Sequence, residues 1–203
     1  MDWRTIIAGM MLATIVAAAP ANAAADNPPK VAQPAPWLPT SFSPPVLAKA
    51  TGFKLVPLGP ALVKIDYDAY MSSIDHLQRT FTRSTDWPHK NLTATDAMTG
   101  MKNEAARFRK RESFAYGVLT PDGRRERGSV YVSPSAVAGY NAVVRLWVTK
   151  AEHDAGFDAE LYAWVQTWVR ANWPFAKVAY PGRAIDWATW DALVAASKKN
   201  REE

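Results

Sequence analysis

The chain has 203 residues, of which 48% are apolar, a formal net charge of +5, and no cysteine. This length and apolar content are sufficient for one domain with a sizeable core. The lack of cysteine excludes a thiol nucleophile, a disulfide framework and thiolate metal sites.

The first 23 residues have the pattern of a secretory signal peptide. The apolar run over residues 6–19 follows Arg4, and it is shorter than the ~20 residues that a membrane-spanning helix needs. Ala23 closes a small-residue cleavage site, and Ala25 offers a second one. The sequence therefore predicts a periplasmic or secreted protein with no membrane span after cleavage, or a cytoplasmic protein if the leader is not functional.

A proline-rich segment over residues 24–50 is predicted to be a linker, because proline removes backbone donors and favours an extended chain. The apolar residues Trp37, Leu38 and Phe42 of this segment could pack against the domain. We expect the domain to span residues 51–198. Residues 199–203 are predicted to be a polar tail.

The first half of the domain is predicted to contain a strand, two helices and a hairpin. Alternating apolar residues indicate a strand over residues 52–58, and apolar residues at helical spacing indicate a helix over 65–81. A second helix is expected from Thr93 or Thr95 to about Arg111. The turn sequence Thr-Pro-Asp-Gly joins two strands, 113–119 and 127–132, into a hairpin.

The second half is predicted to be a strand–helix–strand unit followed by a final helix. The run AVVRLWV over residues 142–148 reads as a buried strand, and a polar loop over 149–156 leads to a helix with helically spaced Trp164 and Trp168. A strand over 176–180, parallel to the first, and a helix over 186–199 complete the chain. We therefore predict an α/β fold of the α+β kind, a mixed sheet with helices on both faces.

This order of elements, with the sequences FKLVPL, FAYGVLTPDG, GSVYV and VVRLWV, resembles the GNAT superfamily of acyl-CoA-dependent N-acyltransferases. The resemblance covers Phe53 to about Trp190, and it implies a GNAT-like sheet that lacks the usual final strand pair. It also implies that acetyl-CoA is the co-substrate and that a small-molecule or peptide amine is the acceptor.

The resemblance further implies where acetyl-CoA and the reacting groups lie. The pantetheine arm would enter a gap between strands 144–148 and 178–180, with a backbone N–H near Trp147 or Val148 polarising the thioester. The pyrophosphate would rest on backbone amides near His153 to Gly156. The implied cofactor-binding residues are Leu146, Trp147, Val148, Lys150, His153 and Gly156, and the implied catalytic residues are Tyr180, as acid to the leaving thiolate, and Glu152.

Several alternatives remain open at this point. Glu152, Asp154 and Asp158 place negative charge where a phosphate would sit, which favours an exported, non-catalytic binding protein of the cell envelope. Tyr180 could be an ordinary strand-end aromatic residue. An interaction module that uses the proline-rich arm is a third possibility.

Two further kinds of site are not expected. The histidines lack the spacing of a metal site, so we predict none. The basic runs over residues 107–111 and 124–127 could hold phosphates, but the first ends a helix, where cations are favoured in any case, so we expect no nucleic-acid partner.

Overall fold

The computed structural model describes residues 37–202, and side chains as far as residue 200. The predicted leader, 1–23, and most of the predicted linker lie outside the described residues. None of the helices within residues 37–202 is long and apolar enough to cross a membrane.

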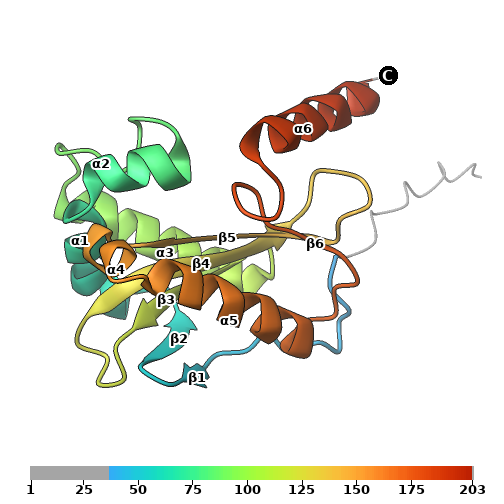
Figure 1. The fold of residues 1–203 in the computed structure, drawn as a ribbon. Coiled ribbons are helices and arrows are strands. Elements are labelled where there is room, and N and C mark those ends of the chain that lie inside the picture. The colour runs from blue at the N-terminus through green and yellow to red at the C-terminus, as the bar shows by residue number, and fades with distance from the viewer. Residues whose placement is uncertain (1–36, 203) are drawn as a thin grey trace, which may run out of the picture. The chain divides into compact units, whose positions relative to one another are not determined.

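A six-stranded sheet, ordered β1-β2-β3-β4-β5-β6, forms the centre of the fold (Figure 1). Neighbouring strands are antiparallel except β5 and β6, which are parallel as predicted. The strands are β1 (Ala48–Ala50), β2 (Phe53–Pro57), β3 (Phe114–Leu119), β4 (Glu126–Pro134), β5 (Ala142–Val148) and β6 (Val178–Ala179).

Helices cover both faces of the sheet, so the predicted mixed sheet with helices on both faces is confirmed. One face packs against α5 through Leu161 and Val165, and the other packs against α1 and α3 and, beside β6, against α6. No strand follows α6 within the described residues. The helices are α1 (Val63–Met71), α2 (Ile74–Leu77), α3 (Ala94–Lys110), α4 (Lys150–Asp154), α5 (Phe157–Asn172) and α6 (Trp187–Glu202), with a 3-10 turn η1 (Pro60–Leu62) and a π-helical turn η2 (Gln78–Thr82).

The predicted single helix over residues 65–81 is interrupted at Ser72 and Ser73. The Ser72 hydroxyl donates to the carbonyl of Ala69 at 2.6 Å, and the Ser73 hydroxyl accepts the N–H of Lys150 at 2.9 Å. Serine side chains that bond to the backbone in this way compete with a continuous helix. The interruption redirects α2 and η2 toward the end of β5.

The folded unit begins before residue 51, where the sequence prediction placed its start. Leu38 is buried, and the Trp37 indole N–H donates to the carbonyl of Arg111 at 2.8 Å. Strand β1 also lies within the predicted linker. The described part of the proline-rich segment is therefore bound to the domain through its apolar residues.

Candidate functional site

A wedge opens between β5 and β6 because the two strands pair only at their beginnings. The paired positions are Ala142 with Val178 and Val143 with Ala179. Strand β5 continues to Val148, while the chain after Ala179 turns away through residues 180–183. The predicted divergence of these strands is thus present in the structure.

The open edge of β5 presents the backbone groups of Leu146 and Val148. The N–H of Thr149 donates to the carbonyl of Arg127 at 2.9 Å, and a Cβ placed on Gly128 would lie 2.1 Å from the carbonyl oxygen of Trp147. Residues 147 and 149 are therefore directed toward β4. Because successive residues of a strand point their backbone groups to opposite edges, Leu146 and Val148 are directed toward the wedge. The predicted oxyanion donor is accordingly not the amide of Trp147.

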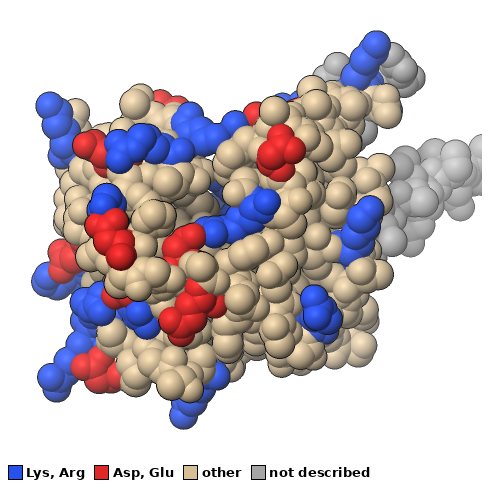
Figure 2. Space-filling model, in the orientation of Figure 1, with Lys and Arg blue, Asp and Glu red and all other residues tan. Residues whose placement is uncertain are grey.

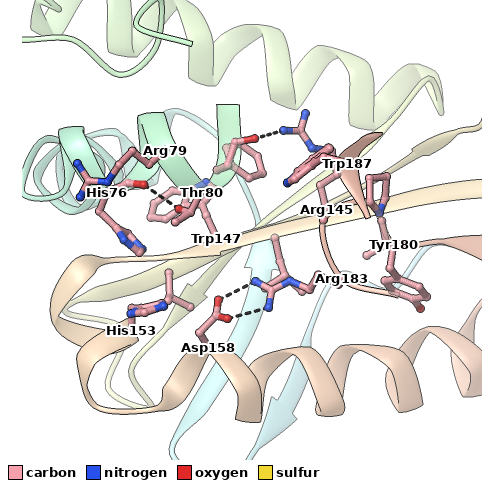
Figure 3. Close-up of a pocket in the computed structure, with 16 residues that line it drawn as sticks. His76, Arg79, Thr80, Arg145, Trp147, His153, Asp158, Tyr180, Arg183 and Trp187 are labelled. Atoms are coloured by element: carbon pink, nitrogen blue, oxygen red, sulfur yellow. Dashed lines mark hydrogen bonds and ion pairs between the residues drawn. The ribbon is translucent and has the colours of Figure 1, made fainter. Parts of the chain in front are cut away.

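A cavity of about 300 Å³ lies in this wedge (Figure 3). Strand β5, the turn after β6, the α2–η2 segment, the start of α5 and Trp187 of α6 all contribute to its wall. Of the predicted cofactor-binding residues, Leu146, Trp147, Val148 and His153 line the cavity.

Lys150 and Gly156 do not line this cavity. Lys150 pairs with Asp154, and Gly156 caps α5 with a positive φ of 83°. The amides of His153 and Gly156 donate to the carbonyls of Thr149 and His153, at 2.9 and 3.0 Å. These two amides of the predicted phosphate loop are therefore occupied by local hydrogen bonds, because α4 replaces the loop.

Glu152 lies outside the cavity lining and is held on the hairpin side by two arginines. Arg125 donates to one carboxylate oxygen at 2.6 Å, and Arg127 donates to the other at 2.9 and 2.5 Å. Burial raises the pKa of Glu152, but the hydrogen bonds from both arginines outweigh it and hold the pKa below its ordinary value. A carboxylate held in this way is a poor proton acceptor, so its position does not suit the catalytic role that was predicted for it.

Each acidic residue that was expected to repel a phosphate has a basic partner. Glu152 and Asp154 are paired as described, and Asp158 forms a bidentate pair with Arg183, with both N···O distances 2.7 Å. Figure 3 shows this pair spanning the wedge between the turn after β6 and the start of α5. Basic and acidic side chains are likewise interspersed on the face seen in Figure 2. The negative charge predicted for this region is therefore neutralised locally.

Imidazole and guanidinium groups line part of the cavity. The rings of His76 and His153 have centroids 4.8 Å apart, and Arg79 lines the same wall. Burial lowers the pKa of His76, and the nearby His153 and Lys150 lower it further. These effects favour the neutral form of the His76 imidazole.

Tyr180 lines the cavity, but its side chain packs in the main core. Its ring lies 5.6 Å from that of Tyr162 on α5, and Figure 3 shows it directed toward α5. Burial raises the pKa of Tyr180 to about 12, so the hydroxyl keeps its proton at neutral pH. A role as proton donor stays a prediction, while the packing is that of a strand-end aromatic residue.

The cavity also contains residues that were not predicted as site residues, namely His76, Arg79, Arg145, Asp158, Arg183 and Trp187. One signal was available in the sequence. Arg145 is the charged residue within the β-branched run of β5, and such an interruption indicates a side chain with a specific partner. Within residues 37–202, no group of three or more His, Asp or Glu side chains is arranged to hold a metal ion.

Comparisons of the whole chain with known proteins gave matches only among solved structures. No family model and no curated protein matches the chain. A ribosomal-protein-S5-alanine acetyltransferase from Vibrio fischeri is 12% identical, with a TM-score of 0.48, over 62% of this chain and 67% of that chain.

The structure of RimL, a ribosomal L7/L12 alpha-N-protein acetyltransferase in complex with coenzyme A, is 14% identical, with a TM-score of 0.47, over 63% of this chain and 67% of that chain. A further neighbour, from Vibrio cholerae, is matched over 62% of its own length. Both of these solved structures are described as acetyltransferases.

Proposed function

We propose that this chain is a GNAT-type N-acyltransferase that moves an acetyl or other acyl group from acyl-CoA to an amine. The observation that carries the proposal is the unpaired edge of β5, which forms one wall of a cavity whose lining includes Arg79, Arg145 and Arg183. An extended pantetheine arm can pair with free strand amides as an added strand would. The amides of Leu146 and Val148 face this edge.

The cavity offers side chains, more than backbone amides, to the phosphates of acyl-CoA. Since the amides of His153 and Gly156 are already bonded, we infer that the phosphates are held mainly by side chains. Arg79, Arg183 and His153 supply guanidinium and imidazole donors in the cavity lining. The guanidinium fork of Arg183 suits a phosphate as well as it suits the carboxylate of Asp158.

The reaction that this site supports is direct transfer. The amine nitrogen bonds to the thioester carbonyl carbon, the carbon–sulfur bond breaks, and the amine proton finally resides on the released thiol. The amide of Leu146 or Val148 donates to the carbonyl oxygen as negative charge develops on it. His76, whose neutral form is favoured, takes the proton from the amine.

Titration calorimetry with acetyl-CoA and CoA tests the proposal. We expect the wild-type chain to bind both ligands and Arg183→Met to bind them roughly tenfold more weakly, the loss expected for one charge-assisted hydrogen-bonding group. Arg109→Met is the matched control, because Arg109 is an exposed residue of α3 outside the cavity lining. If neither ligand binds the wild-type chain, the proposal is wrong.

Turnover can be followed by the release of CoA thiol. The chain contains no cysteine, so a thiol reagent reports only the released CoA.

A further inference from the structure

A second cavity, of about 360 Å³, adjoins the wedge and shares Phe81 and Arg145 with it. It lies on the face of the sheet that α3 covers, with aromatic walls from Phe81, Trp87 and Tyr131 and with the Glu104–Arg107 ion pair of α3 in its lining. Arg145 is a residue of β5, and its neighbour Leu146 directs its backbone toward the wedge. Arg145 therefore stands between the proposed thioester site and a separate aromatic pocket.

The guanidinium of Arg145 has no carboxylate partner among the described residues. Its carbon lies 4.3 Å from the centroid of the Phe81 ring and 5.6 Å from that of Trp187. One of its N–H groups donates to the carbonyl of Phe81, and its Nε is buried without a hydrogen-bond partner. By contrast, four arginines near the wedge and the hairpin form ion pairs with carboxylates, namely Arg83, Arg125, Arg127 and Arg183.

A buried donor without a partner destabilises the folded protein, so its presence calls for a reason, and a bound partner is one such reason. The planar guanidinium fork matches a carboxylate, with two parallel hydrogen bonds. The aromatic walls of the second cavity suit a flat apolar body. The acceptor amine must reach the wedge, and Arg145 is part of the wedge lining.

We propose that Arg145 binds the carboxylate of the acyl acceptor, and that the acceptor is an aromatic α-amino acid whose ring lies in the second cavity. This proposal rests on the proposed acyl transfer and names the acceptor class for that site. In the reaction the amino group of the acceptor becomes an amide, while its carboxylate stays on Arg145.

The test compares phenylalanine with 2-phenylethylamine, which has the same ring and amine but no carboxylate. Wild type, Arg145→Met, Arg145→Lys and the control Arg109→Met are each measured for acetyl-CoA binding by calorimetry, for acceptor binding without acyl-CoA, and for thiol release. Thermal unfolding of each variant shows whether it is folded.

We expect wild type to prefer phenylalanine in kcat/KM by about 10- to 100-fold, the range expected for a charge-assisted pair. Arg145→Met should remove that preference without weakening acetyl-CoA binding. Arg145→Lys, which keeps the charge and loses the fork, should restore only part of it.

Three outcomes would overturn the inference. If acetyl-CoA binds and both acceptors are used equally by wild type, Arg145 does not recognise a carboxylate, although acyl transfer itself stands. If Arg145→Met weakens acetyl-CoA binding, as Arg183→Met is expected to do, Arg145 serves a phosphate instead. If acetyl-CoA does not bind at all, the proposed function is wrong. In that case the binding of phenylalanine is measured directly. If neither wild type nor Arg145→Met binds phenylalanine, Arg145 does not recognise its carboxylate.

Discussion

The carboxyl groups of Asp66 on α1 and Glu126 on β4 form a buried, electrostatically coupled pair on the face that α1 and α3 cover. The Ser129 hydroxyl donates to Glu126 at 2.7 Å, while the other oxygen of Glu126 lies over Gly117, 3.4 Å from where a Cβ would be. Burial raises the pKa of both carboxyl groups, that of Asp66 to about 7, and that of Glu126 well above its ordinary value. The pair therefore holds protons that the unfolded chain would release near pH 4.

This pair predicts that stability falls as pH rises. Because the folded state binds more protons than the unfolded state between about pH 4 and pH 7, the free energy of unfolding decreases over that range. Asp66→Asn should remove much of this decrease in the free energy of unfolding. Urea unfolding at pH 5 and at pH 8 measures the change for each variant. Asp75→Asn, at an exposed position on α2, is the control. Equal pH slopes in wild type and Asp66→Asn would refute this account.

The ion pairs of Glu152 predict a structural role for this residue. Glu152→Gln leaves Arg127, whose side chain is only 17% exposed, without its counter-charge, and we expect a loss of about 2–4 kcal/mol in the free energy of unfolding. Since the pKa of Glu152 is lowered, the loss should be present above about pH 5 and shrink as pH falls through that pKa. Glu160→Gln, on the exposed side of α5, should have little effect on stability.

The Glu152→Gln variant also tests the catalytic role that the sequence resemblance implied. Thiol release per folded molecule should change little. A loss of at least about 100-fold in kcat at unchanged stability would contradict the structural role and restore the catalytic one.

At the scale of elements, the turn after β6 shapes the wedge through its contact with α6. Gly182 has a φ of 74°, and a Cβ there would lie 2.5 Å from the Trp187 ring. The turn therefore lies directly against the indole, which is part of the cavity wall. The guanidinium of Arg83, in the loop after η2, also lies over the Trp187 ring, 4.1 Å from its centroid, and pairs with Asp191 of α6.

Gly182→Ala should destabilise the domain by about 1–3 kcal/mol and weaken acetyl-CoA binding, because the turn and Trp187 must separate. Gly139→Ala is a matched control, since Gly139 has a similar φ of 83° with nothing within 4 Å of its Cβ position. Urea unfolding and calorimetry measure the two effects. Equal losses in both variants would mean that backbone strain alone is responsible.

Sequence patterns predicted the strands and turns that are determined by residues within the element itself. The hairpin and β5 were predictable because the turn residues and the β-branched run lie within the elements themselves. The break between α1 and α2 was not, because Ser73 accepts its hydrogen bond from Lys150, which is distant in sequence. The lack of a hydrogen-bond partner for Nε of Arg145 was also unpredictable, since it depends on which groups surround it in the folded chain.

At the scale of the whole molecule, the sequence of the first 23 residues still predicts an exported protein. We propose that the chain is cleaved after Ala23 or Ala25, and intact-mass measurement of protein from fractionated cells checks this. A chain that keeps Met1 and stays in the cytoplasm would refute the proposal and place the protein beside the cellular acyl-CoA pool.

The bidentate pair of Arg183 with Asp158 has a consequence for how an anion would enter the wedge. An arriving phosphate would displace a carboxylate that is already attached to the protein, so it would exchange one counterion for another. The displaced Asp158 would then become a free negative charge at the start of α5, where the helix dipole stabilises it. Phosphate binding would thus depend on competition between the phosphate and the Asp158 carboxylate for Arg183, and added salt would weaken both interactions.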